Sequence, residues 1–341
     1  MKKSSMKKAL TVLTLVLGCT WGSQQASAQV DPHFTQYYIY PSWTNSALTG
    51  SFDGSYRVSG IFRTQWGNIG VPFLTQGLSA EFTTDKNLNY GVSFMNQTAG
   101  DGGYRYTTMY GNIAFTGLRF GPIENHRIVF GMQAGFIQRR FDVNKLNFQS
   151  QYNDVTGLPD KLSGEILQTP RSGTFDAGAG VMYFDATPGK KVNFYGGYSA
   201  SHLTRPTDRF LGSTVENSKL PMRHLLHAGA RIRLNDQWNI TPNALYMTQG
   251  TAKETMIGFY SQYKATAETD LMAGANYRIN DAFSPFLGFS HKRFVLGLSY
   301  DINASDLGKL AKASNSFEIS LAISGRRNVK TPEVEFVCPR L

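Results

Sequence analysis

The amino-acid sequence predicts an all-β protein, a transmembrane antiparallel β-barrel of about 14 strands. Apolar and polar side chains alternate in many segments, as they do in strands that expose one apolar face. Aromatic residues make up 13% of the chain and charged residues only 17%, yet the mean hydropathy is −0.28. Short turns and long loops also alternate between these segments. The side-chain pattern alone fits a soluble sandwich as well, but the three features together are typical of an outer-membrane barrel.

The first 28 residues resemble a secretory signal peptide. A lysine-rich start, a short apolar stretch and small residues ending at Ala28 provide its three regions, so we expect cleavage before Gln29. Cys19 is a weaker candidate for a lipoprotein acceptor, because the bulky Leu17 lies where a small residue is preferred. No run of about 18 apolar residues follows. A membrane role therefore has to come from strands.

The charge and cysteine content of the mature chain exclude several classes of function. Cleavage after Ala28 would remove four lysines and no acid, which lowers the formal net charge from +10 to +6. This mild excess does not indicate nucleic-acid binding, and an exported protein would not meet nucleic acid. Cys338 is the one cysteine left, so an intrachain disulfide or a cysteine-built metal site is excluded.

Residues 29–55 precede the first predicted strand. Pro32 and Pro41 argue against regular structure there, and the many aromatic residues argue against a disordered tail. Two interpretations remain open for this segment. It packs on the end of the barrel, or it enters the lumen and plugs it.

Fourteen segments with strand character lie between residues 56 and 324, which we assign to the barrel. In the last of them, Phe317 and Ile319 alternate with Glu318 and Ser320, which predicts an apolar face backed by a polar one. The apolar side of the fourth segment changes near its middle, which predicts a β-bulge. The predicted strands are 56–65, 77–84, 88–97, 104–117, 126–142, 174–185, 192–202, 222–234, 238–248, 254–266, 269–278, 283–290, 293–300 and 316–324.

The connections between the predicted strands fall into two sets. If the N-terminus is periplasmic, every second connection should be a tight periplasmic turn. The short connections fall near 85 and at 121–125, 186–191, 235–237, 267–268 and 291–292. The other set contains the long loops 66–76, 143–173, 203–221 and 301–315. This alternation of short and long connections places residues 325–341 in the periplasm as a C-terminal tail.

Charged residues within the predicted strands are expected to face the lumen. An arginine on the lipid face costs about 2–4 kcal/mol at the middle of the bilayer. We interpret the inward charges as a structural ion network, in which Asp176 and Glu318 pair with Arg231, Arg233 or Arg278, in preference to acid–base catalysis. The expected lumen charges are Asp176, Arg231, Arg233, Arg278 and Glu318.

The sequence contains no convincing catalytic, cofactor or metal site. His224 and His227 are three residues apart on a predicted strand, so they point to opposite faces, which argues against a shared metal. The Gly-x-Gly in F-D-A-G-A-G lies within a predicted strand, with no helix to receive a phosphate. We therefore expect no enzymatic activity and no cofactor.

Residues 31–50 are similar to the opening of the PorP/SprF family of the Bacteroidota type IX secretion system. That opening reads D-P-x-F-x-Q-Y followed by P-x-x-x-N-P-A-x-x-G, and Ser46 stands here in place of the usual proline. The matching residues are Asp31, Pro32, Phe34, Gln36, Tyr37, Pro41, Asn45, Ala47 and Gly50.

Further segments resemble the same family, in order along the chain. F-R-T-Q-W at 62–66 is similar to its first-strand motif, and the segments 198–206 and 223–230 resemble its H-L and R-H motifs. The closing Y-D and E-I motifs are present, although Phe317 stands where histidine is common. The last four residues resemble its C-P-basic-aromatic ending, with Leu341 in place of the aromatic residue. The motif residues here are Arg63, Gln65, Trp66, Tyr300, Asp301, Glu318 and Cys338.

The resemblance covers nearly the whole mature chain and implies a function. It implies an outer-membrane barrel without enzymatic activity that takes part in exporting proteins with a type IX C-terminal signal, and in gliding motility for some members. The implied partners are the PorK/PorN ring, a PorE-like periplasmic protein and the secreted cargo, with the lipid bilayer around the barrel. Whether the chain is a core component or serves one cargo stays open.

Candidate docking surfaces follow from the predicted topology. We expect the outer loops 143–173 and 203–221, and on the periplasmic side 29–55 and 325–341, to meet partners. The tail is basic through Arg326, Arg327 and Lys330, although such residues also mark the membrane boundary. Two alternatives remain: a passive channel for small or apolar solutes, and a barrel enzyme, for which we find no coherent nucleophile, base and orienting group.

Overall fold

The structure, a computed structural model, covers most of the 341-residue chain. The predicted signal peptide with Cys19 lies outside the described residues. So do the tail residues Arg326, Arg327, Lys330 and Cys338. The structure describes residues 31–325 apart from 53, 68–69, 85, 101–102, 143–144, 146–150, 154–155, 157–170, 208–218 and 306–314.

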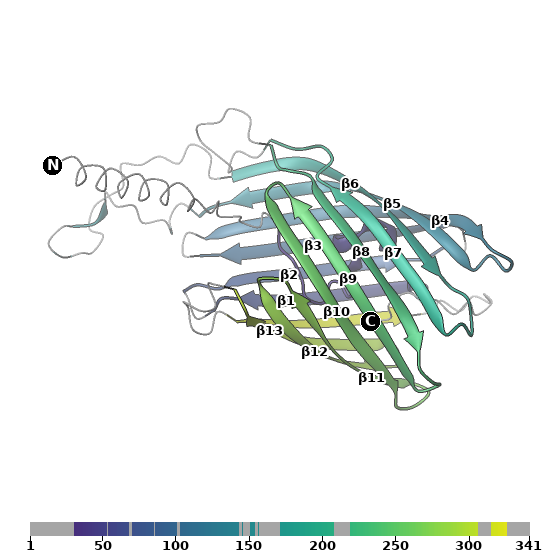
Figure 1. The fold of residues 1–341 in the computed structure, drawn as a ribbon. Helices are drawn as coiled ribbons and strands as arrows, with labels where there is room; N and C mark the ends of the chain where they lie inside the picture. The colour runs from purple at the N-terminus through teal and green to yellow at the C-terminus, as the bar shows by residue number, and fades with distance from the viewer. Residues whose placement is uncertain are drawn as a thin grey trace, which may run out of the picture.

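Fourteen antiparallel strands in the described part of the chain form one closed barrel (Figure 1). Each strand pairs with its sequence neighbours, and β1 pairs with β14 to close the wall. The prediction of a barrel of about 14 strands is confirmed. The strands are β1 Tyr56–Gln65, β2 Phe73–Phe82, β3 Leu88–Ala99, β4 Tyr104–Phe120, β5 His126–Arg140, β6 Arg171–Asp185, β7 Val192–Ser201, β8 Arg223–Arg233, β9 Trp238–Gln249, β10 Ala252–Lys264, β11 Thr269–Arg278, β12 Ala282–His291, β13 Phe294–Asn303 and β14 Ser316–Gly325.

The strand boundaries agree with the sequence prediction to within a few residues. The largest shift is at β2, which begins at Phe73 and so shortens the preceding loop. The predicted bulge in the fourth strand is present, because the register of β4 with β5 shifts between Phe115 and Leu118. Long connections follow odd-numbered strands, and we call that end of the barrel the outer end, as in bacterial outer membranes. We call the other the periplasmic end.

The barrel wall has an apolar outer face and a polar inner face. Along β5, Phe136 and Met132 point outward and are 66% and 70% exposed, whereas Val129 and Ile137 point inward and are buried. Arg57 and Arg63 lie on the inner face of β1 and are also buried. These two arginines therefore stay away from the hydrocarbon core of the membrane, where they would be costly.

Two short helices lie in the segment before β1. They are α2, Pro41–Thr44, and the 3₁₀ helix η1, Ser46–Leu48. Pro41 begins α2 at a position where its missing N–H costs no hydrogen bond. Asn45 then caps η1, because its side-chain oxygen accepts from the Ala47 amide at 2.9 Å. None of the described helices is long and apolar enough to cross a membrane.

Candidate functional site

Residues 31–52, which we call the inner segment, lie against the inner face of the barrel. Every residue in it is buried except His33, which is half-buried. At the outer end Asp31 contacts His202, which follows β7, and Arg223, which begins β8. At the periplasmic end the segment leads into β1, where the Ser55 amide donates to the carbonyl of Gly325. The inner segment therefore runs from the outer end of the barrel to the periplasmic end.

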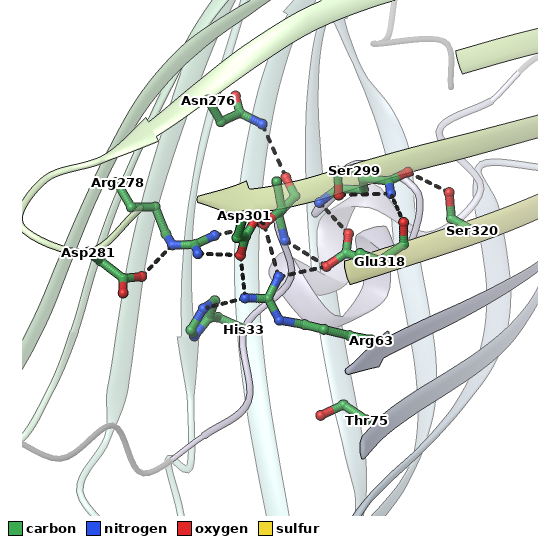
Figure 2. Close-up of polar contacts among 12 residues, drawn as sticks. His33, Arg63, Thr75, Asn276, Arg278, Asp281, Ser299, Asp301, Glu318 and Ser320 are labelled. Atoms are coloured by element: carbon green, nitrogen blue, oxygen red, sulfur yellow. Dashed lines mark hydrogen bonds and ion pairs between the residues drawn. The ribbon is translucent and has the colours of Figure 1, made fainter. Parts of the chain in front are cut away.

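An ion cluster at the junction of β1 and β14 holds the first part of the inner segment (Figure 2). Arg63 of β1 donates to Glu318 of β14 at 3.0 Å and to Asp301 of β13 at 2.7 Å. Arg278 of β11 donates to the same oxygen of Asp301 at 2.6 Å and to Asp281 at 2.6 Å. We call Arg63, Arg278, Asp301 and Glu318 the seam cluster. Its two buried arginines are matched by two buried carboxylates, which buried charges require.

The backbone and side chain of Thr35 lie at the centre of the seam cluster. Its hydroxyl accepts from Arg63 at 2.9 Å and from Arg278 at 2.7 Å, and donates to Asp301 at 2.9 Å. Its amide donates to Glu318 at 3.0 Å. A hydroxyl has one donor and two acceptor positions, so all three are used here.

Gln36 and His33 extend these contacts on either side of Thr35. The Gln36 amide donates to Glu318 at 2.7 Å, and its side chain accepts from Ser320 at 2.6 Å. Burial and the charges of Arg278 and Arg63 hold the pKa of His33 well below its usual range. The neutral imidazole can then accept from Arg63 at 3.2 Å. The seam cluster thus binds His33, Thr35 and Gln36 of the inner segment.

A second cluster, which we call the histidine cluster, holds Asp31 at the outer end. His202 lies 2.7 Å from Asp31 through Nε2 and 2.8 Å from Asp176 of β6 through Nδ1. Arg223 donates to Asp31 at 3.3 Å and to the carbonyl of Trp43 at 2.8 Å. Its guanidinium also lies over the Trp43 ring, 4.4 Å from the centroid.

The protonation of the histidine cluster follows from its geometry. Burial alone would lower the pKa of His202, but Asp31 and Asp176 outweigh it and raise the pKa to about 9. Burial acts to raise the pKa of Asp31, yet the charges of His202 and Arg223 hold it below its usual range. His202 is therefore a cation at neutral pH, and both its ring nitrogens are engaged by carboxylates. Neither nitrogen is free to act as a general base.

Glycines in the wall let the second half of the inner segment approach closely. A methyl group at Gly131 of β5 would overlap the backbone of Ala47, and one at Gly180 of β6 would overlap the Asn45 side chain. Asn45 instead donates to the carbonyls of Val181 at 3.1 Å and Tyr198 at 3.3 Å. The wall and the helix η1 are therefore complementary in shape.

The periplasmic end has its own buried ion pair. Arg57 of β1 donates to Glu81 of β2 at 2.7 Å, and the Gly50 amide donates to the same carboxylate at 3.4 Å. Arg57 also lies over the ring of Phe52, 4.7 Å from its centroid. Gly50 has a φ of 74°, which favours glycine, and a side chain there would overlap Asn89.

Of the family-motif residues in the inner segment, Asp31, Asn45 and Gly50 contact β8, β6 and β2. Gln36 contacts Glu318, which pairs with Arg63, and Arg63 also contacts Asp301, although these motifs are far apart in sequence. Gln65 and Trp66 lie beside them in the wall of a cavity of about 540 Å³ at the outer end. Tyr300 is separate, because it points outward and is 44% exposed.

The expected lumen charges divide into two groups. Asp176, Arg278 and Glu318 are buried on the inner face. Arg231 and Arg233 of β8 are half-buried on inward positions, and Arg233 donates to the carbonyl of Lys190 at the periplasmic rim. We expected Asp176 and Glu318 to pair with these arginines or Arg278, and this was wrong. Asp176 of β6 pairs with His202, which follows the adjacent strand β7, and Glu318 pairs with Arg63, its direct neighbour where β1 meets β14.

Several residues of the site were missed by sequence reasoning. For Arg57, Glu81 and Arg223 the signal was the same inward strand parity that placed Arg278 in the lumen. His202 gave no such signal, because it lies just after a strand. Thr35 gave no signal, because it lies between motif positions. The docking surface expected across 29–55 is wrong for residues 31–52, which are buried. The missed residues are Thr35, Arg57, Glu81, His202 and Arg223.

The arrangement offers little for chemistry on a substrate. Within the described ranges, no three His, Cys, Asp or Glu side chains are placed to hold a metal ion. His227 contacts Asn45 inside the barrel, whereas His224 contacts Tyr198 at 2.7 Å on the outer face. What the polar groups do is to bind the inner segment to the wall at its outer end, at its middle and at its periplasmic end.

Solved structures with a similar fold are outer-membrane barrels. The toluene transporter TbuX of Ralstonia pickettii is 12% identical, with a TM-score of 0.50, 84% of this chain covered and 94% of that chain. The CymD monoaromatic hydrocarbon channel is 12% identical, with a TM-score of 0.49 and coverages of 89% and 95%. At this identity the likeness to TbuX bears on the fold alone. No curated protein sequence matches the chain.

One family of proteins matches most of the sequence. Its description is type IX secretion system membrane protein PorP/SprF, and the match extends over residues 26–323. It includes the inner segment and nearly all of the barrel wall, and therefore both ion clusters. The chain accordingly belongs to the PorP/SprF family of type IX secretion system membrane proteins.

Proposed function

We propose that this protein is a non-enzymatic component of the type IX secretion system in the outer membrane, and that it supports export of cargo with C-terminal signals. Family membership supports the system, and the barrel supports the location. The signal-like residues 1–28 support cleavage before Gln29, which releases the mature chain. By the family argument, some cargo serves gliding motility. The partners are the PorK/PorN ring, a PorE-like periplasmic protein and the secreted cargo.

The observation that carries this proposal is the binding of the inner segment inside the barrel. Residues 31–52 are tied to β1, β8, β11, β13 and β14 by buried ion clusters, so the segment acts as a fixed plug. A plugged barrel is suited to hold partners at its two rims, and less suited to conduct solutes. The docking surfaces are then the outer loops 143–173 and 203–221 and the tail 325–341.

The proposal is tested by deleting the gene and measuring the secreted proteome. We expect loss of all type IX cargo if the protein is a core component, and loss of one cargo if it serves a dedicated role. Normal secretion of every cargo in the deletion strain would contradict both. Complementation with the wild-type gene is the control for the deletion itself.

The role of the tail is tested in the same strain. A chain lacking residues 326–341 should still show heat-modifiable migration on gels, because the described barrel ends at Gly325. We expect it not to restore export. A chain in which the tail is replaced by a Gly/Ser sequence of equal length separates the tail's sequence from its length. Full export by either chain would contradict the proposal that the tail is a docking surface.

A passive channel for small or apolar solutes is the alternative. The cavity of about 540 Å³ at the outer end favours it, and the structurally similar TbuX is a toluene transporter. Against it, a deeper cavity beside Tyr37 and His227 measures only about 20 Å³. Steady conductance by the purified wild-type protein in planar bilayers would favour the channel over the plugged scaffold.

A further inference from the structure

Three arginines lie side by side on the outward face of the barrel, at the outer ends of three neighbouring strands. Arg105 of β4 is directly opposite Arg140 of β5, and Arg140 is directly opposite Arg171 of β6. All three side chains are exposed. We call them the arginine row. With strands about 4.8 Å apart, the row is about 10 Å wide.

The arginine row has no acidic partner in the described part of the chain. Like charges directly opposite each other on adjacent strands destabilise a sheet. The row therefore carries an unfavourable interaction that an anion would relieve.

The outward-facing residues between the arginine row and the periplasmic end show where the row lies relative to the membrane. The next outward positions are Thr107, Gln138 and Gly173, and the positions below those are Met109, Phe136 and Phe175. This last row is apolar and more than half exposed, with the Phe136 and Phe175 rings edge to face at 5.8 Å. The arginine row lies four residues from the Met109, Phe136 and Phe175 row, toward the outer end, which is about 13 Å along the strands.

That spacing corresponds to the headgroup layer. Strands in such barrels tilt by about 35–45°, so 13 Å along them is about 10 Å in height. The apolar rows face the hydrocarbon core, and a headgroup layer of roughly 5–8 Å borders it. The arginine row is therefore at the level of lipid phosphates in the outer leaflet.

The geometry of the side chains also suits phosphate. Guanidinium groups bind phosphate oxygens through two parallel hydrogen bonds, which ammonium groups do not. When the Gln138 amide is oriented so that its oxygen faces the guanidinium of Arg171, that oxygen accepts from Nε at 3.1 Å and from Nη2 at 2.8 Å. This contact fixes one guanidinium in place along the row.

We propose that the arginine row binds the phosphate groups of phosphorylated lipids in the outer leaflet, with the acyl chains against the Met109, Phe136 and Phe175 row. The ligand class is a phosphorylated membrane lipid, and lipid A is a suitable probe. Nothing in the proposed secretion role assigns a lipid to this face.

The test compares three proteins, each purified as the full mature chain in neutral detergent. They are the wild type, the triple variant R105Q/R140Q/R171Q, and a control R119Q/K264Q/R293Q. The control removes the same charge from exposed residues at the periplasmic end. Each is titrated with lipid A, with dephosphorylated lipid A and with inorganic phosphate, and the unfolding temperature is read from heat-modifiable gel migration.

We expect lipid A to raise the unfolding temperature of the wild type and the control, because a ligand that binds only the folded state stabilises it. The triple variant should respond with an affinity on the order of tenfold lower, or not at all. Dephosphorylated lipid A and free phosphate should have no effect. In lipid-free detergent the triple variant should be at least as stable as the wild type, because its like charges are gone.

Four outcomes would overturn the proposal. They are an equal response of the triple variant, a response to dephosphorylated lipid A, a response to free phosphate alone, and a response lost in the control as well. If the triple variant does not fold, the single variant Arg140→Gln takes its place, since Arg140 has an arginine on both sides. The lipid that remains bound after purification, measured as phosphorus per protein, provides a second readout with the same expected order.

Discussion

Arg63 of β1 lies directly opposite Glu318 of β14, and its guanidinium donates to that carboxylate at 3.0 Å. These are the first and last strands, so the pair bridges the junction that closes the barrel. The same carboxylate accepts the amides of Thr35 and Gln36 at 3.0 and 2.7 Å. Closure of the wall and binding of the inner segment therefore depend on one ion pair.

Substitution of one partner of this pair should destabilise the barrel strongly. Arg63→Gln leaves Glu318 buried without its arginine, and a broken buried pair typically costs about 3–5 kcal/mol. The measurement is the free energy of unfolding in urea, with heat-modifiable migration as the check on folding. Arg233→Gln is the control, because Arg233 is only half-buried and should cost about 0.5 kcal/mol or less.

The double variant Arg63→Gln/Glu318→Gln should lose less stability than the sum of the two single variants. Two neutral amides can hydrogen bond to each other, and Asp301 keeps its contact with Arg278 at 2.6 Å. Residues in one ion network typically couple by about 0.5–3 kcal/mol. Strict additivity of the two single effects would show that the pair does not act as a unit.

The Thr35 hydroxyl should contribute more to the free energy of unfolding than the Thr35 methyl group does. Thr35→Val removes a group that contacts Arg63, Arg278 and Asp301, and an unsatisfied buried polar partner costs about 1–3 kcal/mol. Thr35→Ser keeps the hydroxyl and should be close to the wild type. Urea unfolding of both variants gives the comparison. Equal loss in both would assign the effect to packing.

A side chain at Gly131 should displace the helix η1 from the wall. Gly131→Ala places a methyl group into the backbone of Ala47, and overpacking typically costs about 1–3 kcal/mol. Gly173→Ala is the matched control, because a methyl group there meets nothing within 4 Å. Unfolding in urea and conductance in planar bilayers should both change for Gly131→Ala alone. Identical behaviour of the two variants would mean that η1 is not held against β5.

Much of the fold could be predicted from the sequence, because a strand in a barrel wall has a simple rule. Lipid faces one side of every strand, so alternation is strong, and the bulge in β4 appeared as a change of face. The start of β2 was missed because Phe73 and Leu74 are adjacent apolar residues that hide the alternation. Phe73 instead packs edge to face on the Trp66 ring at 5.2 Å.

The site was less predictable, because strand alternation does not identify the partners of its inward-facing groups. Strand parity shows that Asp176 and Glu318 point inward, but not which group they meet there. That depends on how far the strands are staggered around the barrel and on the path of the inner segment. His202 reaches Asp176 from a loop, with a φ of 60°, and no periodic pattern reports such a position.

Labelling of single cysteines should establish which end of the barrel faces outward. Lys253→Cys lines the cavity at the outer end, and Arg293→Cys lies in the turn between β12 and β13 at the periplasmic end. Cys338→Ser provides the background, since it removes the remaining cysteine of the mature chain. A membrane-impermeant maleimide should label Lys253→Cys in intact cells, and Arg293→Cys only after permeabilisation. The reverse pattern would invert the topology and move the arginine row to the inner leaflet.

The histidine cluster should make stability fall as the pH rises above neutrality. His202 has a pKa of about 9 in the folded protein and an ordinary value near 6.5 when unfolded. Between these values the folded state binds more protons than the unfolded state, so the free energy of unfolding falls by up to about 1.4 kcal/mol per pH unit. Below pH 6.5 and above pH 9 the contribution should be flat. In the variant His202→Gln the glutamine side chain does not titrate, so the fall in the free energy of unfolding between pH 6.5 and 9 should be lost. The variant should also be less stable than the wild type at pH 6.5. Urea unfolding at a series of pH values measures both curves, and an equal slope in the two proteins would place the titrating group elsewhere.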